Sequence, residues 1–279
     1  MALVTVEPEA RGVTRPSANV TAGMIAEKVL PVGVFVLLII AWELGVWLFS
    51  PAEYILPAPT DIWSAAVESR DAIWTNLLVT TRELVVGFIL AVVVSLPLAM
   101  ILVASRIVWR ALFPILVVLQ TVPKVAVAPL FVVWFGFTTT PKILTTFLIC
   151  FFPVLLNTIT GLRSAPPEMN EMLRTMGAGM WSTFRRVQFP TALPHFFAGL
   201  KIAVTLAVIG AVVAEFVGST EGLGYMLLQA NANLQTSLLF AIIAVLTLLG
   251  LALFYLVEII ERVTIPWHST RRDLSARTL

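Results

Sequence analysis

The sequence has little charge, little histidine and almost no cysteine. Charged residues make up 12% of its 279 residues, about half the share of a typical soluble domain. This excludes a water-soluble globule, and also a disordered chain or a coiled coil, which need abundant charge. Cys150 is the only cysteine, and His195 and His268 are the only histidines, so an internal disulfide is excluded and no metal site is predicted. The net charge of +2 comes without a basic cluster, which argues against nucleic-acid binding.

Hydrophobic residues, by contrast, make up 59% of the chain and gather in six long runs. Each run is long enough to cross a hydrocarbon core about 30 Å thick, which takes about 20 helical residues. In lipid a helix satisfies its own backbone hydrogen bonds, and the runs lack the alternation of membrane β-strands. We therefore expect an all-α, polytopic membrane protein in contact with lipid, with about six transmembrane helices near 29–49, 84–104, 111–135, 141–162, 198–217 and 237–257.

Lysine and arginine residues set the expected orientation, because they are enriched in cytoplasmic loops. With the N-terminus inside, 13 of the 18 Lys and Arg residues fall in inside segments and 3 in outside loops. Both termini are therefore predicted to be cytoplasmic. The expected organisation is a cytoplasmic tail at 1–28, a transmembrane domain at 29–261, whose first run stays as an uncleaved anchor, and a cytoplasmic tail at 262–279.

Three stretches between the runs are long enough to fold outside the hydrocarbon core. Residues 50–83 are expected on the outer side, with an amphipathic helix at 61–78 whose N-cap is Thr60. Residues 218–236 form the second outer loop. Residues 163–197 are expected in the cytoplasm and carry the clearest pattern.

A short helix is predicted at the start of the 163–197 stretch. Pro166 and Pro167 end the fourth run, because proline lacks the backbone donor that continues a helix. After them, apolar residues recur with helical spacing and form one stripe, and Gly177 fits a left-handed C-terminal cap. The stripe consists of Met169, Met172, Leu173 and Met176.

A second short helix is expected at about 179–189, ended before the fifth span by Pro190 and Pro194. It carries Trp181, Phe184 and Val187 on one side. A methionine-rich and aromatic face on a helix pair is suited to a groove in a partner protein. It is equally suited to the membrane interface, and the pattern alone leaves both open.

The same stretch resembles the EAA loop of bacterial ABC importer permeases, whose pattern is Glu-Ala-Ala, three residues, Gly, nine residues, then Ile-x-Leu-Pro. Identity and spacing match at Glu171, Gly177 and Pro190, and the Ile and Leu positions hold other apolar residues. The two alanines are replaced by the larger Met172 and Leu173, so the packing of this helix is expected to differ in detail.

The resemblance covers roughly residues 80–260. The segments TVPKVAVAPLFVVWFGF at 121–137, FPVLLNTITGLRSAPPE at 152–168 and GLKIAVTLAVIGAVVAEFVGSTEGLGY at 199–225 are similar to permeases of nitrate, sulfonate, taurine and vitamin-precursor importers. The last two are most similar to permeases for thiamine-precursor pyrimidines and riboflavin. A vitamin-like heterocycle is therefore the expected solute, with sulfonate, taurine or nitrate as alternatives.

The resemblance implies the fold and the partners of a type I ABC importer in the bacterial inner membrane. Two permease copies, usually a homodimer, form the pathway, two cytoplasmic ATPases lie beneath them, and an extracytoplasmic binding protein delivers the solute. The chain has no Gly-x-x-x-x-Gly-Lys-Ser/Thr phosphate loop, so we expect it to be non-catalytic and to bind no cofactor, with ATP held by the partner. The residues expected to couple to the ATPase are Glu171, Met172, Arg174, Met176, Gly177, Trp181, Phe184 and Pro190.

Polar residues inside the apolar runs are candidates for the translocation path, because a charge at the bilayer centre costs about 2.5–3.5 kcal/mol on insertion scales. Lys124 lies between Pro123 and Pro129, in a run that Pro114 is expected to break further, and it either lines the path or snorkels to the interface. Glu215 is more readily a structural hydrogen-bond partner than a solute contact, and Asn157 either lines the path or joins helices. The candidate path residues are Lys124, Gln120, Asn157 and Glu215, and Gly222 and Gly224 are expected to shape an outer loop or gate.

Two other classes of protein fit the composition but not the pattern. An ion-coupled carrier could use Glu43 and Glu215 for coupling, yet it leaves the patterned cytoplasmic helices unexplained. A membrane enzyme would need a His/Asp/Glu cluster, a Gly-x-Ser-x-Gly elbow or metal-ligand spacing, and the sequence has none of these.

Overall fold

The computed structural model describes residues 18–267, and the secondary structure within them is entirely helical. Side chains are described for this range except at 18–29, Pro31, Asn170, Arg174 and Met180. The elements in chain order are α1 (Ala18–Phe49), α2 (Pro59–Glu68), α3 (Arg70–Ala104), α4 (Arg106–Thr121), α5 (Lys124–Phe135), α6 (Thr139–Arg163), α7 (Pro167–Thr175), α8 (Met180–Thr183), a π-helical turn η1 (Phe184–Gln188), α9 (Phe189–Gly218), α10 (Leu223–Ala232) and α11 (Thr236–Thr264).

The chain divides into two compact units, residues 1–60 and 61–279. In the first, α1 contains an apolar stretch long enough to span a membrane, Val32–Phe49. The carboxylate of Glu43 accepts hydrogen bonds from the Thr60 backbone N–H (3.1 Å) and hydroxyl (2.8 Å). Thr60 is therefore engaged with α1 and does not supply the predicted N-cap, and α2 begins one residue earlier, at Pro59.

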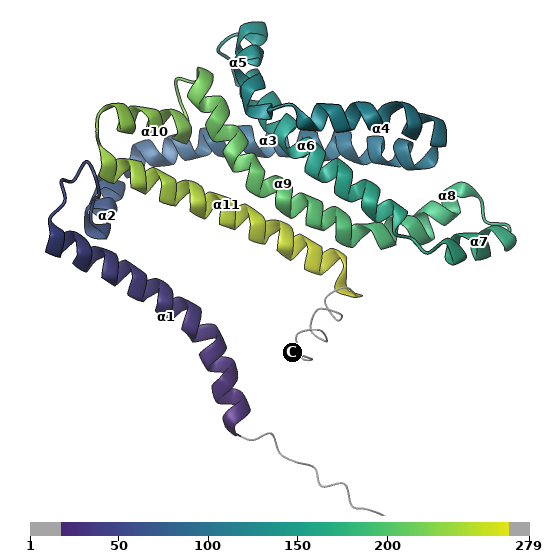
Figure 1. Ribbon diagram of the computed structural model, residues 1–279, viewed down its shortest axis with the longest axis horizontal. Coiled ribbons are helices and arrows are strands. Elements are labelled where there is room, and N and C mark those ends of the chain that lie inside the picture. Colours follow the sequence, from purple (N-terminus) through teal and green to yellow (C-terminus); the bar gives the residue numbers. More distant parts are fainter. Residues whose placement is uncertain (1–17, 268–279) are drawn as a thin grey trace, which may run out of the picture. The chain divides into compact units, whose positions relative to one another are not determined.

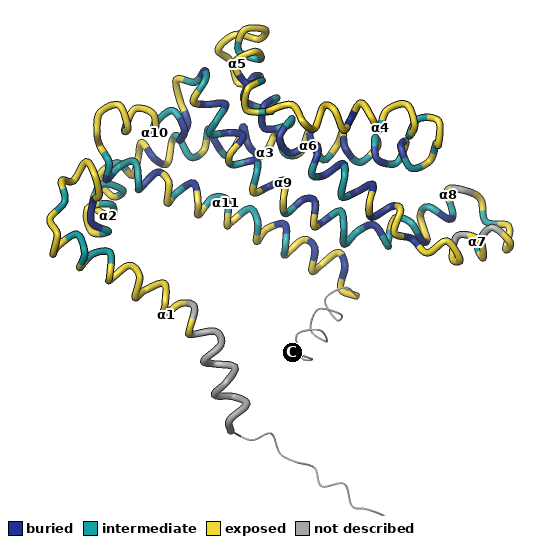
Figure 2. The backbone as a smooth tube through the Cα atoms, in the orientation of Figure 1, coloured by how far each residue is buried: buried dark blue, intermediate teal, exposed yellow. Residues whose placement is uncertain are grey.

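The second unit is a bundle in which α6 and α9 pack together along their length, with α3 and α11 beside them (Figure 1). Small residues allow the close approach of α6 and α9. A Cβ at Gly199 would lie 2.8 Å from the Cβ of Asn157, and one at Gly210 would lie 3.1 Å from the Cα of Thr146. The buried residues lie along the facing sides of α3, α6 and α9 (Figure 2). The core is thus built by helices meeting through alanine and glycine, as is common between membrane helices.

The prediction of about six transmembrane helices is confirmed. Among the described residues, five helices are long and apolar enough to cross a membrane, and α4 with α5 makes a sixth candidate that is bent by 92°. The predicted run 111–135 is therefore interrupted, as the prolines around Lys124 indicate, but at one place only. The bend lies at Val122 and Pro123, because Pro123 has no N–H to continue α4. Pro114, expected to break this run, lies inside an uninterrupted α4.

The outer amphipathic helix predicted at 61–78 is also wrong in its extent. The helix α2 ends before Ser69, and the residues from Arg70 onward belong to a second helix, α3, which extends to Ala104. At 1.5 Å per residue, α3 is about 50 Å long, so it exceeds a hydrocarbon core of about 30 Å. The predicted run 84–104 is only its second part.

Candidate functional sites

The predicted helix of the 163–197 stretch is present as α7, and it ends where the sequence predicts. Gly177 has a φ of +78°, in the left-handed region that glycine adopts without strain. The N–H of Ala178 donates to the carbonyl of Leu173 over 2.9 Å, which is the backbone closure of a Schellman cap. Glycine at this position therefore turns the chain from α7 toward α8.

The methionine stripe of α7 is exposed. The exposed fractions are 47% for Met169, 55% for Met172 and 74% for Met176. Trp181, just after the turn, is 67% exposed and stacks on Phe184 with ring centroids 5.5 Å apart. Glu171 is exposed on the side of α7 away from this stripe, and the side chain of Arg174 lies outside the described part.

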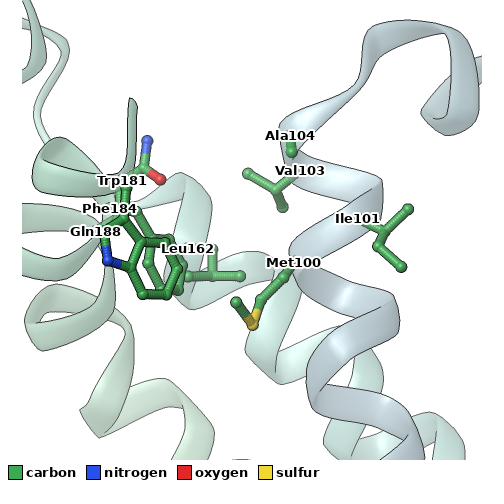
Figure 3. A pocket seen from close by; sticks show the side chains of 8 residues that line it. All are labelled: Met100, Ile101, Val103, Ala104, Leu162, Trp181, Phe184 and Gln188. Carbon is green, nitrogen blue, oxygen red and sulfur yellow. The ribbon is translucent and has the colours of Figure 1, made fainter. Parts of the chain in front are cut away.

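The base of this segment borders an apolar cavity of about 480 Å³. Trp181, Phe184 and Gln188 lie on one side of it, and the end of α3 lies opposite, with Met100 and Val103 (Figure 3). Both sides of the cavity are formed by helices. The exposed methionine and tryptophan side chains are therefore attached to helical structure and not to a loop.

The expected end of the second short helix is wrong. Pro190 and Pro194 do not separate it from the fifth span, because α8, η1 and α9 run on without a gap from Met180 to Gly218. The π turn Phe184–Gln188 precedes Pro190, with the N–H of Phe189 bonded to the carbonyl of Phe184. Such a widened turn accommodates a helix residue that lacks its own donor. The turn after α7 is thus joined rigidly to a membrane helix.

Three of the four predicted path residues lie together. One open cavity of about 560 Å³ lies at the bend between α4 and α5, with α6 and α9 forming its other walls. It is lined by Gln120, Lys124 and Asn157. The Nζ of Lys124 donates to the carbonyl of Gln120 (3.0 Å) and lies 5.1 Å from the ring centroid of Phe152. The Nδ2 of Asn157 donates to the carbonyl of Pro153 (2.8 Å), which leaves its Oδ1 for another donor.

Glu215 does not join this group. It is 1% exposed, and its carboxylate accepts hydrogen bonds from the hydroxyl of Thr80 (2.6 Å) and the N–H of Gly224 (2.5 Å). The Thr80 hydroxyl in turn accepts from the N–H of Leu223 (2.8 Å). Gly222 begins the turn into α10 with a φ of +105°, where an L side chain would be strained. Glu215 therefore fastens the start of α10, and the two glycines shape that turn.

A buried ion pair that the sequence did not reveal lies near the same end of the bundle. Lys142, near the start of α6, is 4% exposed and lies 2.5 Å from the carboxylate of Glu83, which is 2% exposed. Lys142 also donates to Ser219 at the end of α9 (3.0 Å). The one sequence feature that could have indicated this pair is Glu83, an acidic residue at the edge of a long apolar run.

Residues 83–265 match the family described as the binding-protein-dependent transport system inner membrane component. The chain belongs to this family. The permease is thus a multi-pass inner-membrane subunit of an ABC importer.

Curated relatives agree with this assignment. The permease is 37% identical to the formylaminopyrimidine transport permease protein ThiX of Halalkalibacterium halodurans, over 84% of this chain and 93% of the relative. It is 38% identical to the riboflavin transport system permease protein RibX of Chloroflexus aurantiacus, over 86% and 90%. It is 31% identical to the putative aliphatic sulfonates transport permease protein SsuC of Bacillus subtilis, over 84% and 85%.

Among solved structures, the permease resembles a chain of the MetNI methionine ABC transporter in an inward-facing conformation. The TM-score is 0.62 with 19% sequence identity, and the match covers 70% of this chain and 97% of that one. This likeness supports the fold of the helical bundle.

Proposed function

We propose that the permease conducts a small organic solute, received from an extracytoplasmic binding protein, and that a separate ATPase drives it by docking on the α7–α8 segment. The observation that carries this proposal is the exposed face of Met172, Met176 and Trp181 on a helix whose end is fixed by Gly177. A flexible, polarisable methionine face is suited to a partner's groove. The chain supplies no phosphate loop of its own.

The proposed coupling runs through α9. Because α8, η1 and α9 are continuous from Met180 to Gly218, a push on the α7–α8 turn moves α9 as one body. Ile202, Leu206 and Ile209 of α9 line the cavity that holds Lys124. Closure of the ATPases would thus change that cavity, and with it the access of solute from either side. Two copies of the chain, both termini inside, complete the proposed pathway.

Within the segment we assign each residue a role. Met172, Met176 and Trp181 fill the groove, Phe184 supports Trp181 from beneath, and Gly177 sets the angle of α7. Arg174 is assigned to a polar contact at the edge of the groove, Glu171, on the other side of α7, to a polar contact outside the groove, and Pro190 to the π turn that joins the segment to α9.

The docking proposal is tested by placing one new charge on or beside the stripe. Met176→Lys puts an ammonium group in the middle of the apolar contact, where it loses its hydration without a partner. Thr175→Lys puts the same group on the neighbouring residue, which is exposed and off the stripe. We expect Met176→Lys to abolish ATPase co-purification and ATP-driven uptake, and Thr175→Lys to retain both. Equal retention by the two variants would contradict the proposal.

For the solute we propose a vitamin-like heterocycle, such as a thiamine-precursor pyrimidine or riboflavin. Two relatives, at 37% and 38% identity, are named for such compounds. The cavity offers groups that suit a heterocycle, with the Phe152 ring for stacking and the amides of Gln120 and Asn157 for hydrogen bonds.

One observation favours a second candidate. Lys124 is a cation in this cavity, and a cation suits an anionic solute such as a sulfonate or nitrate. Ligand-stabilisation screening of the cognate binding protein separates the two: heterocycles that raise its melting temperature support the first candidate, and sulfonates that do so support the second. Lys124→Met should then reduce uptake of an anion strongly and that of a neutral heterocycle little.

A further inference from the structure

Three arginines converge on a second cavity, at the junction where α3 ends, α4 begins and α6 ends. Arg106, Arg110 and Arg163 line this cavity of about 260 Å³ together with Trp109. The guanidinium carbon of Arg163 lies 3.4 Å from the centroid of the Trp109 ring, so that arginine is held in place by stacking.

The charge of this cluster is uncompensated. In the described part of the chain, none of the three guanidinium groups forms an ion pair, and no carboxylate lines the cavity. Arg106 and Arg110 are four residues apart on α4, a spacing at which like charges repel. The N-terminus of α4, capped by Ser105, adds further positive potential. The three arginines are exposed, and an anion in the cavity would lower the repulsion between them.

The surroundings of the arginine cavity suit an amphiphilic ligand, because apolar surface lies next to the three cations. Val103 lines both the arginine cavity and the apolar cavity of about 480 Å³ that is drawn in Figure 3. Ile107, beside Arg106, is 81% exposed, as expected for a side chain that faces acyl chains. The cluster also lies at the ends of the apolar helices α3 and α6, the level at which headgroups meet the protein.

We propose that this junction binds an anionic phospholipid, with its phosphate among Arg106, Arg110 and Arg163 and an acyl chain in the neighbouring apolar cavity. Guanidinium groups form paired hydrogen bonds with phosphate oxygens, and basic pockets between transmembrane helices suit acidic headgroups. The apolar cavity is bounded by Trp181 and Phe184, so the lipid would brace the end of α3 against the base of the α7–α8 segment.

Native mass spectrometry of the full chain in detergent tests this site without any ATPase. Phosphatidylglycerol and phosphatidylcholine with the same acyl chains serve as probes. We expect the wild type to retain phosphatidylglycerol roughly tenfold better, and Arg106→Gln/Arg110→Gln to lose that preference. Arg185→Gln/Arg186→Gln removes the same charge from exposed positions on η1 that do not line the cavity, and it should keep the preference.

Four further results test the site. Arg106→Lys/Arg110→Lys keeps the charge but not the paired hydrogen bonds, so it should keep a reduced preference for phosphatidylglycerol even if the Gln variant elutes poorly. Equal retention of the two lipids by the wild type, or equal loss in both Gln variants, would overturn the site. Stabilisation by inorganic phosphate at millimolar concentration, without any lipid preference, would also overturn it and assign the cluster to a free anion.

Discussion

At the scale of single residues, several buried charges of the bundle lie in pairs between helices. Glu83 is paired with Lys142 between α3 and α6, and Lys201 with Glu261 between α9 and α11. Glu215 is satisfied by hydroxyl and amide donors. Such groups lie in a low-dielectric interior only because their partners are present. These buried groups hold neighbouring helices together. Lys124 differs from them, because it lines a cavity.

The Glu83–Lys142 pair gives a direct prediction. Lys142→Met leaves the Glu83 carboxylate buried without its cation and also removes the hydrogen bond to Ser219. Removing one partner of a buried pair costs about 3–5 kcal/mol, so we expect the unfolding temperature in detergent to fall by roughly 10 °C. Differential scanning fluorimetry measures this shift.

The matched control is an exposed pair. Arg70 lies 3.7 Å from Asp71, with side chains 75% and 96% exposed, and such pairs contribute little. Arg70→Met should therefore leave the unfolding temperature nearly unchanged. If Lys142→Met behaved like Arg70→Met, the fastening role of the buried pair would be refuted.

The structural role of a single residue could be predicted from the sequence only where it depends on neighbouring residues in the chain. Gly177 could be placed because a helix end needs a left-handed residue. Lys142 and Glu83 could not be paired, because they are far apart in the chain and only the packing of α3 against α6 brings them together. Glu215 was a candidate for the path and for a structural hydrogen bond, and its partners, Thr80 and Gly224, come from the fold.

At the scale of elements, the turn between α7 and α8 is the most sensitive point of the proposed docking segment. Gly177→Ala forces a Cβ into the left-handed region (φ +78°), at a cost of about 1–2 kcal/mol. We expect the end of α7 to reorganise and ATP-driven uptake to fall several-fold. A transport assay in proteoliposomes with the ATPase and binding protein present measures this.

Gly179 is the control for the same turn. It lacks a positive φ, and a Cβ there would meet no atom within 4 Å. Gly179→Ala should therefore transport as well as the wild type. Equal activity of the two alanine variants would mean that the shape of this turn does not matter for coupling.

The elements themselves were largely predictable, because long apolar runs in lipid have few alternatives to helix. Several of the errors concern proline. Pro114, Pro129 and Pro194 lie inside helices, whereas Pro123 does mark the expected interruption, a 92° bend. Whether a proline breaks a membrane helix depends on whether neighbours or a widened turn satisfy the freed carbonyl. That information is tertiary and is absent from the local sequence.

At the scale of the whole second unit, the α7–α8 segment and α10 lie at opposite ends of the bundle (Figure 1). The helix α9 connects them, from the π turn after Thr183 to the loop at Ser219 that Lys142 and Glu221 hold. The proposed function needs such a connection, since force enters at one end and solute at the other. It also requires that the permease in proteoliposomes accumulate no solute unless the ATPase and ATP are present.

The most direct test of this account is the sidedness of the docking segment. The only natural cysteine, Cys150, is fully buried, so single-cysteine reporters at Met176 (74% exposed) and Leu234 (69% exposed) can be labelled with a membrane-impermeant maleimide. The account predicts that Met176→Cys reacts only in inverted vesicles and is protected there by the ATPase, whereas Leu234→Cys reacts only in intact spheroplasts. Labelling of Met176→Cys from the outside, or full labelling in the presence of bound ATPase, would contradict it.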